Sequence, residues 1–498
     1  SGDSVVLDPG CGAGTFQVRA HSRLKNIAPG KNHEELLEQL WGIDIARYPA
    51  HMSVINLAAR DLASTENYPK IIHDDFFKVF PRRSQYEFYK RSYKVASVST
   101  EKVQTSVPLF DAVVGNPPYT RQEEMEDLFP GLKERAHSAI KTDWKLEVSK
   151  RSSIHALFFL HGAAFVKEGG YLGLLTHSSW VDVDYGKYLQ EFFLKHFKVV
   201  AILEPQVEHW FPAVDVNTSI TILQRCNHKT ERSNNTVKFV QMKAPLLEFL
   251  PKYGGEEERM AAFENIVSRT EATDSLQEDD LWRIFPVKQS ELWYEGLDED
   301  GKFAGSKWGK YLRAPDIFFH ILERGKDKFT QLKDFAEVKF GIKTGANDFF
   351  FVTDITDSVS EIELKQYGIT PAKKKQLRLV ESGDGGRYVI EADYLKPLVK
   401  STRDIKSLTI DESITKFRVL IVSDEKKALV GKNVLKYIRG GETKSFGVGP
   451  RAGVPAKKPT CANRNPWYAL DEKNVGKFLW FMNITVAHFF PVMRLAGK

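Results

Sequence analysis

The 498-residue sequence is poor in cysteine and contains no long apolar run. Its three cysteines, Cys11, Cys226 and Cys461, lie far apart and match no zinc or disulfide spacing. The most apolar run, residues 154–166, is too short to span a bilayer and contains two histidines. No signal peptide, repeat or low-complexity tract is visible. These absences argue against a disulfide-stabilised secreted protein, and they predict a cytoplasmic protein with no metal site and no membrane partner.

The charge of the chain is unevenly distributed. Residues 1–230 carry 27 Lys and Arg against 27 Asp and Glu, residues 231–300 carry 8 against 16, and residues 301–498 carry 36 against 22. The length predicts two or three domains. A basic C-terminal block predicts a polyanionic partner, and a merely solvated lysine-rich surface is the alternative.

One tetrapeptide has the composition of an amine-binding turn. The apolar run 110–115 predicts a buried parallel strand that ends in a sharp turn at its glycine. Asn116, Pro117, Pro118 and Tyr119 follow. The prolines remove two backbone donors, so carbonyls there are left to accept hydrogen bonds from a ligand. The Asn116 side chain and the Pro117 carbonyl can grip an exocyclic amino group while Tyr119 stacks on its ring. The alternative is an ordinary strand-end turn.

A glycine-rich turn stands near the start of the sequence. A short strand over residues 4–7 leads into Asp8, and a helix is expected after Phe16. The turn between them contains Gly10, Cys11, Gly12 and Gly14. Strand, glycine-rich turn and helix form the nucleotide-cradling unit of a doubly wound sheet. No phosphate-binding lysine follows, which excludes a P-loop, and Asp8 can accept hydrogen bonds from a cationic amine.

Two further strands end in acidic residues. Residues 41–45 predict a strand in which Asp44 accepts from a ribose hydroxyl and Ile45 covers an adenine face. The alternative for Asp44 is a helix N-cap. The strand at 71–72 is followed by Asp75, a predicted acceptor for an adenine amino group, and by Phe76, predicted to pack on the ring. Open α/β sheets bind ligands at this edge.

The combination and order of these motifs resemble a known family. The motifs DPGCGAGTF at 8–16, GIDI at 42–45, HDDFF at 73–77 and NPPY at 116–119 are similar to those of γ-class, S-adenosylmethionine-dependent N6-adenine DNA methyltransferases. The resemblance implies an α/β fold with a Rossmann-like, doubly wound, seven-stranded sheet in a catalytic domain at 1–230. It also implies S-adenosylmethionine as cofactor. The implied catalytic residues are Asn116, Pro117, Pro118 and Tyr119.

The resemblance extends to base and sequence recognition. The segment 208–212 resembles the family loop that carries a base-stacking aromatic, and Phe211 is the residue carried over; a core aromatic is the alternative reading, and Trp210 a substitute. Residues 231–309 predict an acidic linker or insertion. Residues 310–498 resemble the mixed, mostly β specificity domain of TaqI-like methyltransferases, through FGIKTGAN at 340–347 and RNPWY at 464–468.

The implied function is site-specific methylation of adenine N6 in double-stranded DNA, within a restriction-modification or phage-defence system whose other subunits are possible partners. Two alternatives stay open. One is a catalytically silent DNA-recognition subunit of a defence complex. The other is an RNA or protein amide N-methyltransferase that shares the NPPY motif. We also expect the full protein to continue on both sides, with a motif and helix upstream and more of the recognition domain downstream.

Overall fold

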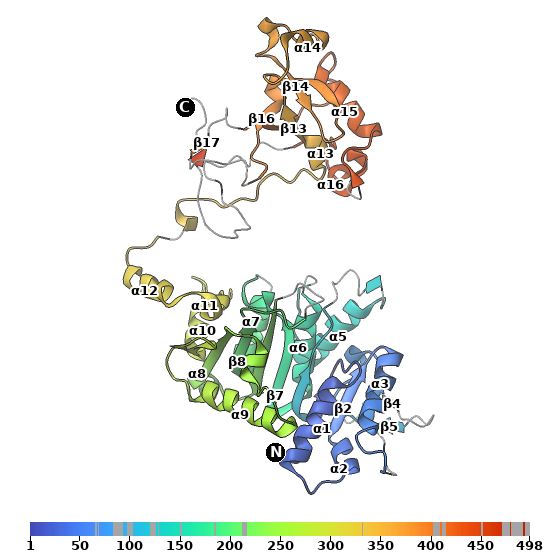
Figure 1. Ribbon diagram of the computed structural model, residues 1–498, viewed down its shortest axis with the longest axis vertical. Coiled ribbons are helices and arrows are strands. Elements are labelled where there is room, and N and C mark those ends of the chain that lie inside the picture. Colours follow the sequence, from blue (N-terminus) through green and yellow to red (C-terminus); the bar gives the residue numbers. More distant parts are fainter. Residues whose placement is uncertain are drawn as a thin grey trace. The chain divides into compact units, whose positions relative to one another are not determined.

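A computed structural model gives the fold of the chain (Figure 1). The structure describes residues 1–64, 67, 69–82, 93–96, 103–119, 126–127, 129–149, 152–183, 186–211, 217–330, 332–401, 409–410, 415–449, 452–470, 479 and 492–493. The chain divides into two compact units, Ser1–Lys326 and Asp327–Lys498.

The first unit is built on one large sheet. Within the described residues it has twelve strands in the order β11-β12-β10-β8-β9-β7-β6-β1-β2-β3-β4-β5. The strands are β1 (Val6–Asp8), β2 (Leu40–Asp44), β3 (Lys70–His73), β4 (Tyr93–Ala96), β5 (Val103–Thr105), β6 (Phe110–Gly115), β7 (Val166–His177), β8 (Phe197–Pro205), β9 (Thr218–Arg225), β10 (Thr236–Met242), β11 (Gln277–Glu278) and β12 (Trp282–Lys288). The unit therefore has an α/β fold with a large sheet.

Helices connect these strands. They are α1 (Thr15–Ile27), α2 (His33–Glu38), α3 (Arg47–Ala58), α5 (Leu132–Trp144), α6 (Ile154–Gly162), α7 (Gly186–His196), α8 (Lys229–Asn234), α9 (Glu256–Ala272), α10 (Gln289–Glu295), α11 (Gly309–Arg313) and α12 (Asp316–Gly325), with 3₁₀ turns η1 (Phe76–Lys78), η3 (Ala163–Phe165), η4 (Ser178–Val181) and η5 (Leu246–Phe249). None of the described helices is long and apolar enough to cross a membrane.

The chain reverses its winding direction around β1. That strand pairs in parallel with β2 on one side and with β6 on the other, and β2 pairs in parallel with β3. The carboxyl ends of β1, β2, β3 and β6 therefore meet at one edge of the sheet. In open α/β sheets this edge, at the point where the winding reverses, is where ligands bind.

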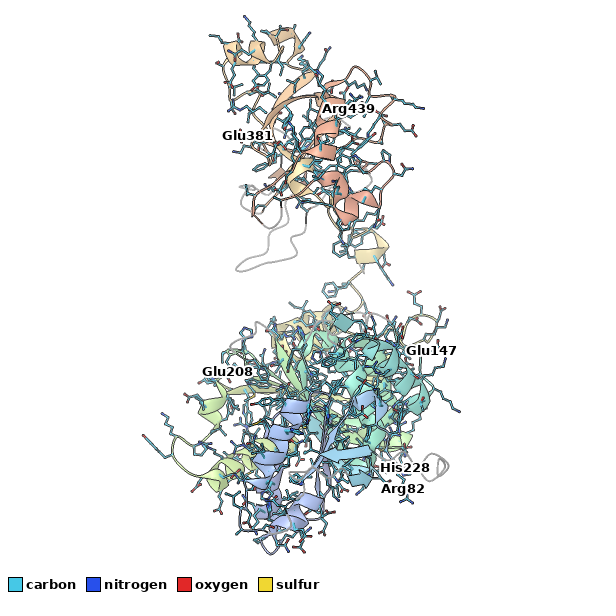
Figure 2. The ribbon with its side chains drawn as sticks, turned by 90° about the vertical axis from the view of Figure 1, so that its right-hand side faces the viewer. Arg82, Glu147, Glu208, His228, Glu381 and Arg439 are labelled. Carbon is cyan, nitrogen blue, oxygen red and sulfur yellow. The ribbon has the colours of Figure 1, made fainter. Side chains whose placement is uncertain are left out.

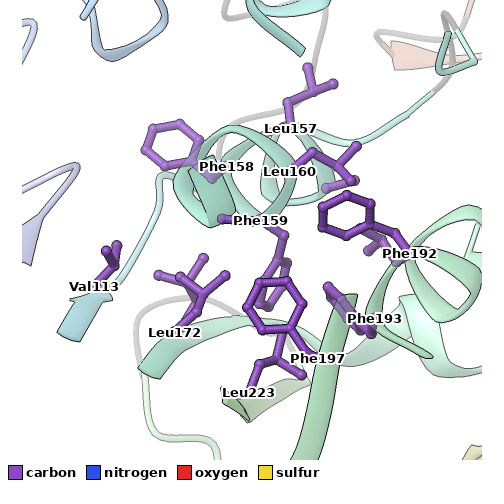
Figure 3. Packing of buried hydrophobic residues seen from close by; sticks show 14 of the residues in the cluster. Val113, Leu157, Phe158, Phe159, Leu160, Leu172, Phe192, Phe193, Phe197 and Leu223 are labelled. Carbon is purple, nitrogen blue, oxygen red and sulfur yellow. The ribbon is translucent and has the colours of Figure 1, made fainter. Parts of the chain in front are cut away.

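Helix α6 packs the middle of the sheet from one side. Figure 3 shows Phe159 of α6 pointing towards Leu172 on β7 and towards Phe197 on β8. Phe159 is fully buried, and its ring centroid lies 5.1 Å from that of Phe193 on α7. The first nine residues of the apolar run 154–166 thus form a helix buried on all sides, because they face the sheet, α5 and α7 together, and the run ends in η3 and the start of β7.

Residues 231–309 differ from the predicted linker or insertion. Strand β10 pairs in parallel with β8, and β12 pairs antiparallel with β10 over seven residue pairs, so both strands extend the sheet of the first unit. Five of the sixteen acidic residues in this segment lie on α9. Figure 1 shows α9 running towards α1, where Arg19 and Arg23 pair with Glu256 and Glu264. The boundary between the units accordingly falls at residue 326.

The second unit has its own core. Five strands form a sheet in the order β15-β14-β13-β18-β16, and each neighbouring pair is antiparallel. Its elements are β13 (Phe351–Asp354), β14 (Leu377–Glu381), β15 (Arg387–Glu391), β16 (Leu395–Pro397), β17 (Thr409–Ile410), β18 (Phe417–Leu420), β19 (Val492–Met493), α13 (Asn347–Phe350), α14 (Glu361–Gln366), α15 (Asn433–Thr443), α16 (Pro459–Ala462), η6 (Leu332–Asp334), η7 (Pro371–Lys373), η8 (Ala392–Tyr394) and η11 (Pro455–Lys457). Tyr437 of α15 stacks on Phe349 of α13 at 4.6 Å and donates a hydrogen bond to its carbonyl. In Figure 2, Glu381 on β14 and Arg439 on α15 mark this unit.

Gly115, at the end of β6, is predicted to tolerate no side chain. A Cβ there would lie 2.7 Å from Asp8 Oδ1 and 3.2 Å from Pro9 Cδ, so β1 and β6 would have to separate. We expect Gly115→Ala to lower the free energy of unfolding by about 1–3 kcal/mol, as overpacking usually does. Urea denaturation measures this. Gly30→Ala is the matched control, since no atom lies within 4 Å of its added Cβ, and an equal effect of the two substitutions would contradict the prediction.

Candidate functional site at the carboxyl edge of the sheet

The glycine-rich turn after β1 is held by its own backbone and by Asp8. The Asp8 carboxylate is buried and accepts a hydrogen bond from the Gly10 amide at 3.1 Å. Gly12 and Gly14 have φ angles of 52° and 85°, a region that favours glycine. The Cys11 amide donates to the Ile43 carbonyl of β2 at 2.9 Å, which joins the turn to the next strand.

Asp44 joins the same turn to the end of β2. Its carboxylate accepts from the Gly12 amide at 2.9 Å and from the Ala46 amide at 2.8 Å. The N-cap of α3 is Ala46, and no side chain caps that helix, so the alternative reading of Asp44 as a helix N-cap is wrong. Each carboxylate oxygen has a second lone pair, so the ribose-binding role stays a prediction. Ile45 beside it is half-buried against the core.

The turn carries an uncompensated acid. Burial raises the pKa of Asp8 to about 7, the hydrogen bond from Gly10 opposes this, and the nearby charge of Asp44 adds to it. Two carboxylates in one cradle, one of them costly to ionise, favour a ligand that brings positive charge.

Asp75 is already paired. Its Oδ2 accepts from Arg135 Nε of α5 at 2.6 Å, and its Oδ1 accepts from the Phe77 amide at 3.0 Å. Its side chain is 4% exposed. The acceptor role predicted for Asp75 towards an adenine amino group stays a prediction. In this structure Asp75 Oδ2 already accepts a hydrogen bond from Arg135.

Phe76 lies in an aromatic cluster of the core. It is 3% exposed, and its ring centroid lies 4.5 Å from that of His161, 5.2 Å from that of Phe158 and 5.3 Å from that of Phe165. The structure thus packs this ring against protein side chains. Its predicted contact with an adenine ring stays a prediction.

A buried ionisable pair, which the sequence motifs do not reveal, holds the Phe76 turn. His161 Nε2 lies 3.1 Å from the Phe76 carbonyl and 3.0 Å from the Val79 carbonyl, and its Nδ1 lies 2.6 Å from Asp143 Oδ2. Carbonyls only accept hydrogen bonds, so Nε2 carries a hydrogen. The Nδ1 contact needs a second hydrogen between ring and carboxyl. This hydrogen lies either on the ring, beside an ionised carboxylate, or on the carboxyl, beside a neutral ring. The pair has no net charge in both cases, which suits its almost complete burial.

The Asn116 to Tyr119 turn follows β6 at the same edge. Asn116 Oδ1 is buried and has no hydrogen-bond partner among the residues that the structure describes. Pro117 is buried, and Pro118 and Tyr119 are half-buried. The Tyr119 hydroxyl donates to the Leu175 carbonyl of β7 at 3.3 Å, which directs its ring across the end of the sheet.

Tyr119 lies between two other rings. Its centroid is 5.4 Å from that of Phe211, with an interplanar angle of 53°, and 5.1 Å from that of His155, at 58°. A planar base between two parallel rings needs about 7 Å, since each stacking contact takes about 3.5 Å. The predicted partners Tyr119 and Phe211 are thus brought together, in direct contact, and a base can lie between them only after Phe211 moves.

The start of the Phe211 loop is anchored. Arg313 of α11 binds Glu204, near the end of β8, through Nε at 2.9 Å and Nη2 at 2.7 Å. Glu208, which Figure 2 labels, accepts from the Leu246 amide at 2.7 Å. These contacts fix the chain up to a few residues before Phe211.

Comparisons with known proteins relate this edge to one class of enzyme. The family model for Eco57I restriction-modification methylases matches residues 38–211. The chain is 19% identical to Type II methyltransferase M.AccI of Acinetobacter calcoaceticus over 372 residues, covering 73% of this chain and 53% of that protein. It is 24% identical to Type II methyltransferase M.XamI of Xanthomonas campestris pv. amaranthicola, covering 45% of each chain. It is 29% identical to restriction enzyme and methyltransferase RM.Eco57I of Escherichia coli, covering 24% of this chain and 11% of that protein.

Solved structures give the same kind of neighbour at low similarity. The type IIG restriction endonuclease BpuSI has a TM-score of 0.44 and 15% identity, covering 88% of this chain and 42% of that one. A modification subunit of a type I restriction enzyme from Vibrio vulnificus has a TM-score of 0.40 and 16% identity, covering 61% of this chain and 55% of that one.

Over part of its length the chain is thus similar to restriction-modification methyltransferases. It spans about half the length, or less, of the curated relatives named here.

The raised pKa of Asp8 predicts a pH-dependent stability. Its folded-state pKa of about 7 exceeds the ordinary value of 3.8, so its contribution to stability is full below about pH 4 and is lost as the pH rises through 7. Asp8→Asn keeps an acceptor for Gly10 and never ionises. We expect the free energy of unfolding of the variant to rise relative to that of the wild type between pH 4 and 8. The rise should be a few kcal/mol at most, at about 1.4 kcal/mol per pKa unit. Urea unfolding across this range measures the gain, and a difference independent of pH would contradict it.

Proposed function

We propose that this protein transfers a methyl group from S-adenosylmethionine to the N6 amino group of adenine in double-stranded DNA. The observation that carries the proposal is the buried, unpartnered Asn116 Oδ1, at the strand end beside the Asp8 turn, as far as the described residues show. An acceptor buried without a donor costs free energy, and a ligand amino group would recover it. The relation to restriction-modification methyltransferases supports this reading.

The residues of the Asp8 turn fit the cofactor. S-adenosylmethionine would supply a methyl group activated by a positively charged sulfonium. Asp8 and Asp44 offer carboxylates to a cation and to hydroxyl groups, and Gly10, Gly12 and Gly14 let the backbone approach closely. A bound cation would also offset the cost of ionising Asp8.

The Asn116 turn would orient the amino group. Asn116 Oδ1 and the Pro117 carbonyl would each accept one hydrogen from N6, which favours a pyramidal nitrogen. They would also stabilise the positive charge that grows on N6 during attack. The rest of the rate acceleration would come from the alignment of N6 with the methyl group in a site that excludes water.

Tyr119 and Phe211 would bind the base by stacking on it. A base inside a duplex must leave the stack to reach this edge, at a cost of a few kcal/mol. Stacking on an aromatic side chain contributes about 1–3 kcal/mol per base, which offsets much of that cost.

The second unit would bind DNA. Residues 327–498 carry 30 Lys and Arg against 20 Asp and Glu, which favours contact with phosphates. Base contacts by this unit would give sequence specificity. Other subunits of a restriction-modification or phage-defence system are the further partners proposed.

Two readings compete with this proposal. In a catalytically silent recognition subunit the cofactor turn would not bind, and a titration with S-adenosylhomocysteine distinguishes the two. In an RNA or protein amide methyltransferase the basic second unit would have no duplex to bind, and methyl transfer to duplex DNA, RNA and peptide substrates separates these classes.

Asn116→Ala should slow methyl transfer by about 10²–10³-fold and leave cofactor and DNA affinity within about twofold. The size is that of losing one hydrogen bond to a developing charge. Labelled-methyl transfer to duplex DNA under single-turnover conditions measures the rate, and Asn227→Ala, on an exposed turn, is the control. Near-normal transfer by Asn116→Ala would refute the role of its side chain.

DNA affinity should depend steeply on salt. If the basic unit contacts several phosphates, the dissociation constant for duplex DNA should rise by about tenfold or more between 50 and 200 mM NaCl, because counterions are released on binding. Fluorescence anisotropy with labelled duplex measures this, and cofactor binding in the same buffers is the control. A salt-independent DNA affinity would exclude phosphate-dominated binding.

A further inference from the structure

A histidine outside every sequence motif contacts the Asn116 turn. His155 is the second residue of α6, after the N-cap Ser153, and it is 8% exposed. Its ring packs against Tyr119, with centroids 5.1 Å apart. The Pro118 backbone lies close enough to the ring to act on its pKa as a hydrogen-bond partner. Two of the four residues of the turn are thus in contact with one imidazole.

Chemistry fixes which ring nitrogen makes this bond. Proline has no backbone N–H, so the Pro118 partner is its carbonyl oxygen, and the imidazole is the donor. His155 Nε2 is buried and has no partner within the described part of the chain. Nδ1 therefore carries the hydrogen and donates it to Pro118, and Nε2 keeps a lone pair.

The imidazole is held uncharged. Burial lowers the pKa of His155 to about 4, the nearby His177 lowers it further, and the Pro118 carbonyl partly opposes both. His177 accepts from the Ser179 amide through Nδ1 at 2.9 Å, and burial lowers its pKa as well. A neutral ring beside this turn adds no charge that would repel a cationic cofactor or the positive charge growing on an amino group.

Helix α6 gives the ring a rigid support. Leu157, Phe159 and Leu160 on the same helix are at most 2% exposed (Figure 3). The Ser153 hydroxyl accepts from the Ala156 amide and so caps the first turn, from which His155 projects. A side chain on such an element holds its partner more exactly in place than a loop residue can.

We propose that His155 is a positioning residue for methyl transfer. It fixes the orientation of the Pro118 carbonyl by a hydrogen bond from Nδ1–H, and that of the Tyr119 ring by direct packing. The orientation of Pro118 fixes that of the preceding peptide, and hence the Pro117 carbonyl and Asn116. This inference rests on the proposed function of the turn. A misplacement of about 1 Å at such a turn can cost about 10²-fold in rate.

Three substitutions of His155 distinguish the contributions of ring packing, Nδ1 and Nε2. His155→Phe keeps the packing on Tyr119 and removes the donor. His155→Asn places an amide N–H near the Nδ1 position, and His155→Gln places one near the Nε2 position. His196→Phe, a half-buried histidine that packs on Trp144 and Phe192, is the control for exchanging imidazole for phenyl in a helix.

We expect His155→Phe to lower the single-turnover rate by about 10–100-fold, with cofactor and DNA dissociation constants and the melting temperature close to wild type. His155→Asn should recover most of the rate and His155→Gln should not. Rescue by Gln but not by Asn would overturn the proposal, because Nε2 would then be the important atom. A normal rate in His155→Phe would overturn it too.

A second measurement does not depend on activity. The ¹⁵N shifts of selectively labelled histidine, assigned by loss of the signal in His155→Asn, report which nitrogen of His155 is protonated. We expect the Nδ1–H tautomer at pH 7, and an Nε2–H ring would overturn the proposal. A wild-type protein that shows the Nδ1–H tautomer but transfers no methyl group would instead count against the proposed function.

Discussion

The close approach of β6 to the end of β1 is the constraint on which the candidate site depends. Because β1 lies between β2 and β6, the glycine-rich turn and the Asn116 turn leave the sheet side by side. Gly115 lets the Asp8 carboxylate pack against the backbone of β6. Asp44 then ties the end of β2 to the amide of Gly12. Three strand ends are thus fixed relative to one another before any ligand binds.

Asp8, Asp44 and Asp75 at this edge differ in their hydrogen-bond partners. Asp44 receives two backbone amides, and Asp75 receives an amide and a guanidinium. Asp8 receives one amide and pairs with no cationic side chain of the described residues, and its burial raises its pKa. Since an unpaired buried carboxylate is costly, Asp8 marks the place in this cradle where a cation would gain most.

The strand ends could be predicted from the sequence because they are local. Short apolar runs that stop at Asp8, Asp44 and Asn116 indicate both the strands and the edge at which they end. Arg135, Asp143, His155 and His161 could not be predicted, because each acts on a segment at least 18 residues away, and no spacing rule reports such a partner. In residues 231–309 the composition is set by sixteen acidic residues, five of them on α9, and it hides the strands β10 and β12.

The contact between Tyr119 and Phe211 bears directly on the proposed binding of a base between these rings. With the rings 5.4 Å apart and tilted, each covers apolar surface of the other that would otherwise meet water. In the proposed function, a base that entered would replace this one contact with two, one on each ring, and so would more than recover the loss of the contact between the rings. The gain is available only if Phe211 can move while Tyr119 stays in place. Tyr119 is held by Leu175 and His155, and within the described residues Glu204 and Glu208 anchor the other loop on the N-terminal side of Phe211.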